Sequence, residues 1–303
     1  MRIYYIGSFK RIHDEEGIAR TLESLGHTVV RAEESHIRSI QKFIEDKPDL
    51  VLFAKLKIVS GLRQQLIDQC KQAGIPTICW VPDLYIGISR ERLVLARDAI
   101  FQADLVLTPD GGHNALWAQY KVNHRLLRQG IYQDECKLEP PKEEPFEVCF
   151  VGTENREFPY RVDLMDRLQK RYGDRFKWIG RTDSDHVRSL DLNTLYSSVK
   201  VVVGDSVYSP RYWSNRVYET LGRGGFLIHP RIEGLDEEFT YYKHLVPYDY
   251  GDYVGLYEKI DYYLTHDTER EAIRLAGFEF TKENHTLLQR CKQLLSYYED
   301  LLA

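Results

Sequence analysis

The chain has 303 residues, 43% hydrophobic and 29% charged, a composition typical of globular proteins and unlike that of disordered, collagen-like or coiled-coil chains. Its 41 basic and 46 acidic residues give a net charge of −5, which excludes a strongly basic nucleic-acid coat protein. No apolar run reaches the roughly 18–20 residues of a membrane span. The five cysteines form no C-x-x-C pair, and the first residues lack a signal-peptide pattern, so we expect reduced thiols and a cytoplasmic location.

The first 140 residues alternate short apolar runs with longer amphipathic stretches. The apolar runs predict strands at 2–6, 27–32, 49–54, 76–82 and 103–109. Between them, the spacing of apolar residues predicts helices that end at Gly26 and Gly74, and two more around 36–45 and 90–102. Strands of about five residues that alternate with helices of about 10–15 form βαβ units, so we expect a parallel sheet in a Rossmann-like, doubly wound domain.

A polar segment at 137–145 interrupts this rhythm, and its three prolines disfavour both a helix and a central strand. The α/β pattern then starts again, with strands predicted at 146–152, 176–180, 199–204, 225–230 and 244–248, and helices at 159–172, 214–223, 252–266, 268–280 and 285–302. We therefore predict two Rossmann-like domains, 1–140 and 146–280. In such sheets ligands bind beyond the carboxyl ends of the strands, here in a cleft between the domains.

Several common catalytic motifs are absent from the sequence. It contains no P-loop, no G-x-G-x-x-G after the first strand, no G-x-S-x-G and no H-E-x-x-H, which argues against P-loop nucleotidases, dinucleotide dehydrogenases, serine hydrolases and zinc proteases. Asp183-Ser184-Asp185 forms a D-x-D pattern that could hold Mn²⁺ or Mg²⁺ on a nucleotide diphosphate. Because D-x-D is common by chance and suits a solvated turn, we favour the turn and predict no metal site.

The most informative stretch is 212–239. Ser214 or Asn215 can cap a helix that continues with Arg216 and Glu219. The N–H groups of its first turn and the guanidinium of Arg216 would suit a phosphate. Glu219 lies one turn after Asn215, where its carboxylate could accept both hydroxyls of a ribose. The stretch therefore fits a nucleotide-diphosphate site, and it fits equally an ordinary amphipathic helix with a glycine-rich C-terminus.

This stretch resembles the C-terminal domain of GT-B glycosyltransferases, especially the group related to the spore maturation protein CgeB. The likeness lies in S-N-R-V-Y-E at 214–219, G-G-F-L at 224–227 and E-G-L-D-E-E-F at 233–239, and it extends to about residue 290. The resemblance implies a GT-B fold, in which C-terminal helices, here 281–303, pack back toward the first domain. It also implies transfer of a sugar from a nucleotide-diphosphate sugar, UDP-glucose by default, without a metal and with retention of configuration.

The resemblance assigns roles to particular residues. It places the donor at Gly152, Thr153, Arg161, Arg181, Ser214, Asn215, Arg216 and Glu219. Among these, Arg216 would stabilise the diphosphate leaving group and Glu219 would bind the ribose. Retaining GT-B enzymes have a Glu-x7-Glu pattern, but Arg211 stands eight residues before Glu219, so the donor sugar and the stereochemistry stay open.

Residues that follow strands of the first domain are candidates for the acceptor side. They are Gly7, Ser8, Asp83 and His113, and each could equally be an ordinary turn residue. If the reaction inverts, Asp83 is the candidate general base. The acceptor itself, a glycan, a small molecule or modified DNA, is not indicated by the sequence, and neither is the oligomeric state.

Two alternative functions remain open. One is a glycosyltransferase that modifies a hydroxymethylated base in DNA, read by the first 140 residues, whose 19 basic and 18 acidic side chains leave them less acidic than the rest. The other is a non-catalytic nucleotide-sugar-binding protein. A basic cluster in the first domain is interpreted as a solvated face; it comprises Lys121, His124, Arg125 and Arg128.

Overall fold

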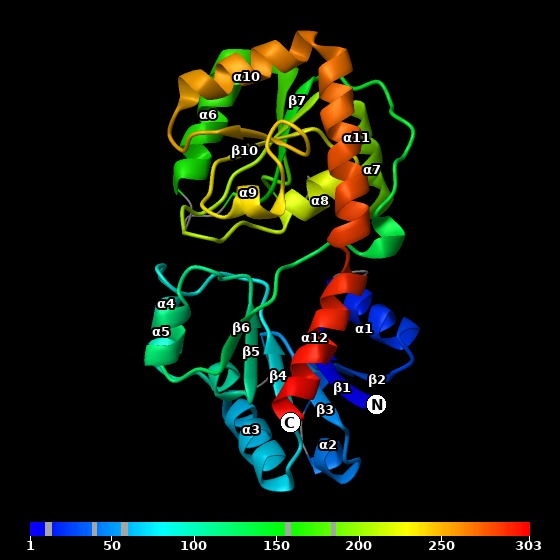
Figure 1. Cartoon of the computed structure of the whole chain (residues 1–303), viewed down its shortest axis with the longest axis vertical. Coiled ribbons are helices and arrows are strands. Elements are labelled where there is room, and N and C mark those ends of the chain that lie inside the picture. Colours follow the sequence, from blue (N-terminus) through cyan, green and yellow to red (C-terminus); the bar gives the residue numbers. More distant parts are fainter. Residues whose placement is uncertain (10–13, 38–40, 56–59, 155–158, 183–185) are drawn as a thin grey trace. The chain divides into compact units, whose positions relative to one another are not determined.

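The computed structural model describes residues 1–303 except 10–13, 38–40, 56–59, 155–158 and 183–185. The chain divides into two compact units (Figure 1). Unit 1 comprises Met1–Tyr132 and Leu287–Ala303, and unit 2 comprises Gln133–Thr286. Each unit has its own parallel sheet, so the predicted pair of Rossmann-like domains is confirmed. Within the described part of the chain, no helix has the length and apolar character that crossing a membrane requires.

Unit 1 is a six-stranded parallel sheet in the order β2-β1-β3-β4-β5-β6. Its strands are β1 (Arg2–Gly7), β2 (Thr28–Glu33), β3 (Leu50–Phe53), β4 (Thr77–Trp80), β5 (Leu105–Thr108) and β6 (His124–Leu126). Its α-helices are α1 (Asp14–Ser24), α2 (Gln41–Glu45), α3 (Ser60–Ala73), α4 (Glu91–Leu95), α5 (Asn114–Gln119) and α12 (Leu287–Leu302). The order of strands reverses at β1, which puts a topological switch point between the carboxyl ends of β1 and β3.

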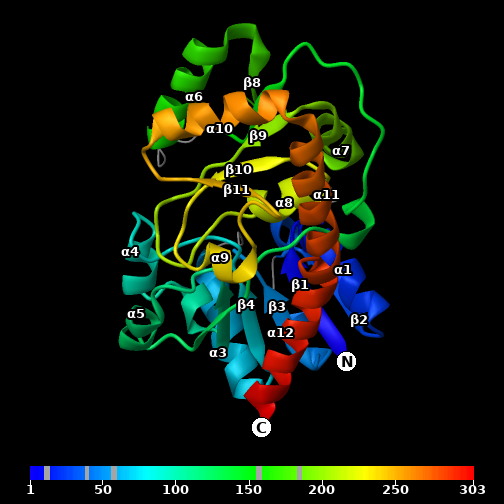
Figure 2. The same cartoon turned by 45° about the horizontal axis from the view of Figure 1, so that its top comes forward.

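The last helix, α12, belongs to the core of unit 1. Leu287, Cys291, Leu294 and Tyr298 recur at intervals of three and four residues and are buried together with Leu22 of α1. Figures 1 and 2 both show α12 beside α1. The apolar face of α12 therefore packs in the core of unit 1, although α12 follows unit 2 in the sequence.

Unit 2 is a five-stranded parallel sheet in the order β11-β10-β9-β7-β8. Its strands are β7 (Val148–Val151), β8 (Phe176–Ile179), β9 (Val201–Val203), β10 (Leu227–Pro230) and β11 (Val246–Tyr248). Its α-helices are α6 (Pro159–Tyr172), α7 (Ser189–Ser198), α8 (Arg216–Gly222), α9 (Leu235–Glu238), α10 (Tyr253–Thr265) and α11 (Asp267–Asn284). Here the switch point lies between β7 and β9.

The helix predicted at 90–102 is wrong as a single element. It consists of α4 and a separate 3-10 helix, Ala99–Gln102. Arg97 between them has a φ of 52°, and the Asp98 side chain accepts a hydrogen bond from the backbone N–H of Ile100 at 3.2 Å. A left-handed residue followed by a new N-cap ends one helix and begins another, whatever the apolar spacing indicates.

Gly277, in the middle of α11, allows this helix to lie close to α8. A Cβ at this position would collide with the carbonyl oxygen of His244 and lie 3.1 Å from Cδ2 of Leu221. Gly277→Ala should therefore lower the stability of unit 2 by about 1–3 kcal/mol, although alanine normally favours a helix. Urea denaturation would measure this. As a control, Gly61→Ala in α3, where a Cβ meets nothing within 4 Å, should be neutral or stabilising; equal effects would contradict the packing argument.

Two members of the basic cluster do not lie on a solvated face, whereas Lys121 is exposed and the side chain of Arg125 is 40% exposed. Arg128 is buried and donates to the carbonyl oxygen of Pro109 at 2.5 Å. His124 stacks on Trp117 with ring centroids 4.6 Å apart, and its Nε2 lies 2.8 Å from Oγ1 of Thr108. These two side chains stabilise the end of the sheet. His124 lies on β6 against β5 and α5, and Arg128, two residues after β6, donates to the residue that follows β5.

Burial lowers the pKa of His124 to about 4, against a smaller opposing effect of Asp110. The unfolded chain takes up the proton near pH 6.5, so stability is full above that pH and is lost as the pH falls toward 4, by up to about 3 kcal/mol. Urea midpoints of the wild type and His124→Gln, measured from pH 7 to pH 4, should show a weaker acid dependence in the variant. Identical slopes would contradict the assignment.

Candidate functional site

The switch point of unit 2 brings together the ends of two strands. Gly152 directly follows β7, and Gly204 and Asp205 follow β9, its neighbour in the sheet. Because both strands run in the same direction, these residues lie at the same edge, where doubly wound sheets bind their ligands. Gly152 and the following Thr153 were predicted for this site, whereas Asp205 was not.

Asp205 is the centre of a buried ion network. Its carboxylate is 1% exposed and accepts from Nε of Arg161 at 2.6 Å and from Nη2 of Arg216 at 2.6 Å. Burial alone would raise the pKa of this carboxyl, but the positive charges of Arg216 and Arg161 outweigh it and hold the pKa below its usual value. One carboxylate and two guanidinium groups leave the network with one excess positive charge.

Both arginines are held in fixed positions. Arg161, on α6, is 5% exposed and also donates through Nη1 to the carbonyl oxygen of Thr153 at 2.7 Å. Arg216, the first residue of α8, is 25% exposed. The guanidinium carbons of Arg161 and Arg216 lie 5.6 and 5.4 Å from the ring centroid of Phe150. Arg216 is therefore the more accessible of two preorganised cations.

Gly152 leaves room for Arg216. A Cβ at position 152 would lie 3.1 Å from Nη1 of Arg216 and 3.0 Å from Cε1 of Phe150. Both contacts are tighter than ordinary van der Waals contact, so a larger residue would displace the guanidinium. The glycine is thus required for space at the arginine pair, in addition to giving a ligand access to the backbone.

Buried polar atoms that lack partners among the described residues gather between the end of β9 and the first residue of α8. Within the described part of the chain, no hydrogen-bond partner exists for five of them: Oγ of Ser206, Ser209 and Ser214, Oδ1 of Asn215 and Nε of Arg216. A buried polar group left unpaired costs about 1–3 kcal/mol, and a cluster of them is typical of a site built for a polar ligand. This segment therefore adds hydroxyl and amide groups to the arginine pair.

The predicted cap of α8 is wrong. Asn215 occupies the N-cap position but has helical backbone angles, φ −54° and ψ −22°, and its side chain makes no capping hydrogen bond. The hydroxyl of Ser214 is also unpaired within the described residues. Since α8 has only seven residues, the positive character of this site comes from Arg161 and Arg216 rather than from a helix end.

Glu219 lies one turn along α8, as predicted from its spacing. Its Oε2 accepts from Nε of Arg223 at 2.6 Å, and its Oε1 lies 3.4 Å from Nδ2 of Asn215. The first contact is short and charge-assisted and the second is long, so Oε1 has capacity left for a ligand.

Arg181, shortly after β8, is engaged with a surface carboxylate. Its side chain is 52% exposed, pairs with Glu154 at 2.8 Å and lies over the ring of Trp178. Asp183 and Asp185 of the D-x-D pattern lie outside the described residues. In the described part of the chain, no three His, Cys, Asp or Glu side chains are grouped as metal ligands.

In unit 1, the structure distinguishes two of the acceptor-side candidates. Asp83, after β4, has cations on both oxygens: Nζ of Lys55 lies 2.5 Å from Oδ2, and Nη1 of Arg90 lies 3.4 Å from Oδ1. His113, after β5, has Nδ1 at 3.0 Å from Oδ1 of the fully buried Asp110. An Asp–His pair of this kind orients the imidazole and leaves Nε2 to face a ligand.

Asp110 is not among the residues predicted for the site. Its carboxylate also accepts from the backbone N–H of Gly112 at 3.1 Å and from Nε1 of Trp117 at 3.0 Å, so its orientation is fixed independently of His113. The signal that could have found it is the spacing in T-P-D-G-G-H, which places a carboxylate three residues before a histidine at a strand end.

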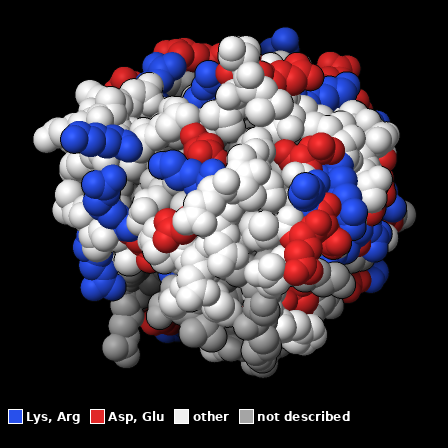
Figure 3. Space-filling view, turned by 90° about the horizontal axis from the view of Figure 1, so that it is seen from below, with Lys and Arg blue, Asp and Glu red and all other residues white. Residues whose placement is uncertain are grey.

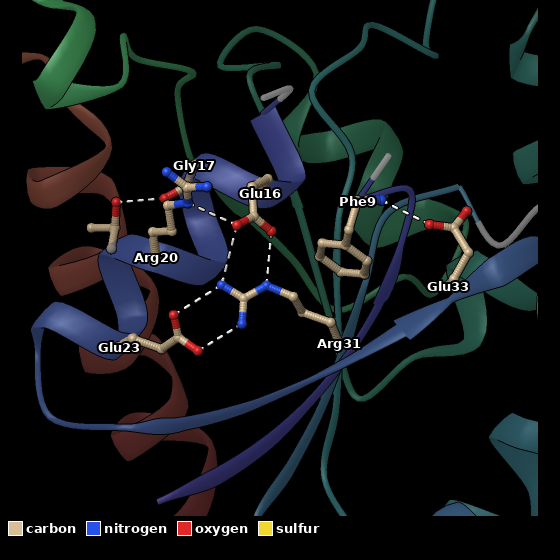
Figure 4. A network of polar contacts seen from close by, with 8 residues as sticks. Phe9, Glu16, Gly17, Arg20, Glu23, Arg31 and Glu33 are labelled. Carbon is tan, nitrogen blue, oxygen red and sulfur yellow. Dashed lines mark hydrogen bonds and ion pairs between the residues drawn. The ribbon is translucent and has the colours of Figure 1, made fainter. Parts of the chain in front are cut away.

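The turn at Gly7 and Ser8 is fixed by the neighbouring strand. The backbone N–H of Phe9 donates to Oε2 of Glu33, at the end of β2, at 2.9 Å (Figure 4). Figure 4 also shows how α1 is tied to β2, because Arg31 pairs with Glu16 at 2.8 Å. Gly7 and Ser8 are thus held at the switch point of unit 1, which is where a ligand of this sheet would bind.

The comparisons with known proteins agree with this geometry. Residues 156–296 match a family described as glycosyl transferase-like. Among solved structures, HepE from Anabaena in complex with UDP and glucose has a TM-score of 0.68 at 12% identity and covers 99% of this chain and 100% of its own. Sucrose-phosphate synthase from Thermosynechococcus elongatus has a TM-score of 0.67 at 15% identity, with coverage of 100% and 99%. No curated protein sequence matches the chain.

At such low identity the structural matches establish the fold. The chain has the GT-B fold, and its residues 156–296 carry a glycosyl transferase-like domain, so the predicted resemblance and the predicted class of enzyme are confirmed. The relationship to the CgeB group stays a prediction.

Proposed function

We propose that the chain transfers a sugar from a nucleotide-diphosphate sugar, with UDP-glucose as the default donor. The observation that carries this proposal is the buried Asp205 with Arg161 and Arg216 at the switch point of unit 2. Two guanidinium groups on one carboxylate supply the net positive charge that a diphosphate requires. The choice of UDP-glucose is supported by the complexes of HepE with UDP and with UDP-glucose, which share the fold.

The donor can use groups that have no hydrogen-bond partner among the described residues. Arg216 would bind the diphosphate and stabilise the charge that develops when the sugar bond breaks. Ser206, Ser209 and Ser214 would satisfy phosphate or sugar oxygens, and Oε1 of Glu219 would accept the ribose hydroxyls. Since arginine performs the charge stabilisation, we propose that transfer needs no metal ion and continues in the presence of EDTA.

The acceptor side is proposed to lie in unit 1, at Gly7, Ser8 and His113. Under retention, a donor phosphate oxygen takes the acceptor proton and no side-chain base is needed. Under inversion a base is required, and His113 fits this role better than Asp83. Asp83 already has a cation on each oxygen, whereas Asp110 orients His113 through Nδ1. The anomeric configuration of the product, observed by NMR, separates the two courses.

No structural observation favours DNA as the acceptor. Arg128 and His124, part of the basic cluster, are engaged in the sheet of unit 1. On the face in Figure 3, lysine and arginine side chains lie among aspartate and glutamate side chains at the right, and several basic side chains follow one another at the left edge. Because Arg128 and His124 are engaged within unit 1, the basic cluster does not form the continuous basic region of a surface that binds duplex DNA, and we do not propose this activity.

The proposal is tested with a panel of nucleotides in thermal unfolding. UDP and UDP-glucose should stabilise the protein in proportion to ln(1 + [L]/Kd), by about 2.7 kcal/mol at 100 times Kd, and uridine should have little effect because it lacks the diphosphate. Slow hydrolysis of UDP-glucose would then separate an enzyme from a non-catalytic binder. The absence of stabilisation by every nucleoside diphosphate would refute the proposal.

A further inference from the structure

Arg223 follows the end of α8, one turn beyond Glu219. Its guanidinium contacts two carboxylates, that of Glu219 on this helix and that of Glu135, 88 residues earlier in the sequence. We propose that Arg223 is the positioning residue of the ribose-binding carboxylate, and that it is itself anchored by the segment through which the chain enters unit 2. This inference rests on the proposed donor site, and it adds to that site a residue that determines how well ribose is distinguished from deoxyribose.

The guanidinium of Arg223 is 5% exposed, and each of its nitrogens has a partner. Nε donates to Oε2 of Glu219 at 2.6 Å, and Nη1 donates to Oδ1 of Asn193 at 2.5 Å and to the carbonyl oxygen of Ser189 at 2.9 Å. Nη2 donates to Oε2 of Glu135. A planar group held from three sides cannot turn. The guanidinium therefore fixes the orientation of the Glu219 carboxylate.

The anchor on the other side is the entry segment, residues 133–137. Asn193, fully buried on α7, donates through Nδ2 to the carbonyl oxygens of Glu135 and Lys137, each at 2.7 Å. Its Oδ1 accepts from Arg223, so one amide side chain connects the backbone of the entry segment to the guanidinium. The Glu135 carboxylate completes the arrangement from the same segment.

This arrangement has a consequence for ligand recognition. Because Arg223 engages Oε2 of Glu219, the carboxylate presents Oε1, whose neighbour Nδ2 of Asn215 is at the long distance of 3.4 Å. Accepting two vicinal hydroxyls requires a carboxylate that is fixed in direction, and the paired guanidinium fixes it. Without Arg223, Glu219 would lose its orientation but would still be present.

The test compares the binding of UDP, 2′,3′-dideoxy-UDP and inorganic pyrophosphate by calorimetry. The wild type should prefer UDP over the dideoxy analogue by about 10- to 100-fold, and Glu219→Gln should remove this preference. Arg223→Gln should reduce the preference to about threefold or less, with pyrophosphate binding unchanged. Arg223→Lys and Glu135→Ala should give intermediate values, and they carry the test if Arg223→Gln does not fold. A purely structural arginine would lower both nucleotide affinities in equal proportion.

Arg274→Gln is the matched control. Arg274 is a partly buried arginine that donates to the carbonyl oxygen of Gly224 at 2.9 Å and pairs with Glu271, so its loss should leave the ribose preference unchanged. If the wild type binds no nucleoside diphosphate, the proposed function fails. If it binds UDP with a ribose preference that Arg223→Gln and Glu135→Ala both retain, only the present inference fails. Equal binding of UDP and its dideoxy analogue by the wild type also overturns the inference.

Discussion

Asp205→Asn should destabilise unit 2 by about 3–5 kcal/mol, the largest effect expected of any single substitution described above. Asparagine keeps the shape of the side chain but removes its charge, which leaves the buried guanidinium of Arg161 and that of Arg216 without a counter-ion. Urea denaturation near pH 7 measures the loss. Since the folded-state pKa of Asp205 lies below its unfolded value, its contribution is full above about pH 4 and is lost as the pH falls through the folded-state pKa, where the two proteins should converge.

A surface carboxylate provides the control for this prediction. Asp261 pairs with Arg171 at 2.8 Å, and both side chains are about half exposed, so Asp261→Asn should change stability by less than about 1 kcal/mol. If Asp205→Asn unfolds the protein completely, a double variant in which Arg161 is also replaced by methionine should recover stability. Removing both charges leaves less buried charge without a counter-ion than removing the carboxylate alone. An Asp205→Asn protein as stable as the Asp261→Asn control would contradict the role of the network.

Arg216→Ala should weaken the binding of UDP by about 10- to 150-fold. This range corresponds to the loss of a charge-assisted contact worth about 1.5–3 kcal/mol. Arg216 is the more accessible member of the arginine pair, and its Nε is unpaired within the described residues, so it retains donors for a phosphate. The fold should survive, because Arg161 still neutralises Asp205. Calorimetry with UDP and with uridine separates the diphosphate contribution from that of the nucleoside.

Arg167→Ala is the matched variant for this measurement. Arg167 lies on α6, like Arg161, but is half exposed and pairs with Asp163 at 2.8 Å. Its removal should leave the affinity for UDP within about twofold, since exposed ion pairs contribute little. If Arg167→Ala and Arg216→Ala weakened the binding of UDP equally, the loss would come from the change in net charge, and the diphosphate would have to bind elsewhere.

Apolar periodicity predicted most of the fold. It failed for elements that are stabilised by tertiary contacts of polar side chains. Strands such as β5, with four buried apolar residues, are evident from the sequence alone. By contrast, α7 was missed because it buries the polar Asn193, and β6 was missed because it carries the basic residues His124 and Arg125. Both elements are stabilised by partners far away in the sequence, which no local pattern can show.

The candidate site was predictable only where function depends on local spacing. The stretch around Arg216 and Glu219 carried its own motif, and the structure places Arg216 against Asp205, which follows β9. Asp205 and Arg223 were not found, because their partners Arg161 and Glu135 are far from them in sequence. Asp110 has the local signal described above, the spacing to His113, and was not recognised from it. A carboxylate after a buried strand, as in V-V-V-G-D, is the one local signal that could have indicated Asp205.

The position of α12 in unit 1 has a consequence for the synthesis of the protein. A ribosome adds about 5–20 residues per second, so the roughly 150 residues of unit 2 delay α12 by roughly 8–30 s after the rest of unit 1 has emerged. During that interval Ile18 and Leu22 lack the side chains of Leu287 and Leu294 that later cover them. The first unit to leave the ribosome is therefore the last to complete its core, and its nascent chain should be a substrate for chaperones until α12 has emerged.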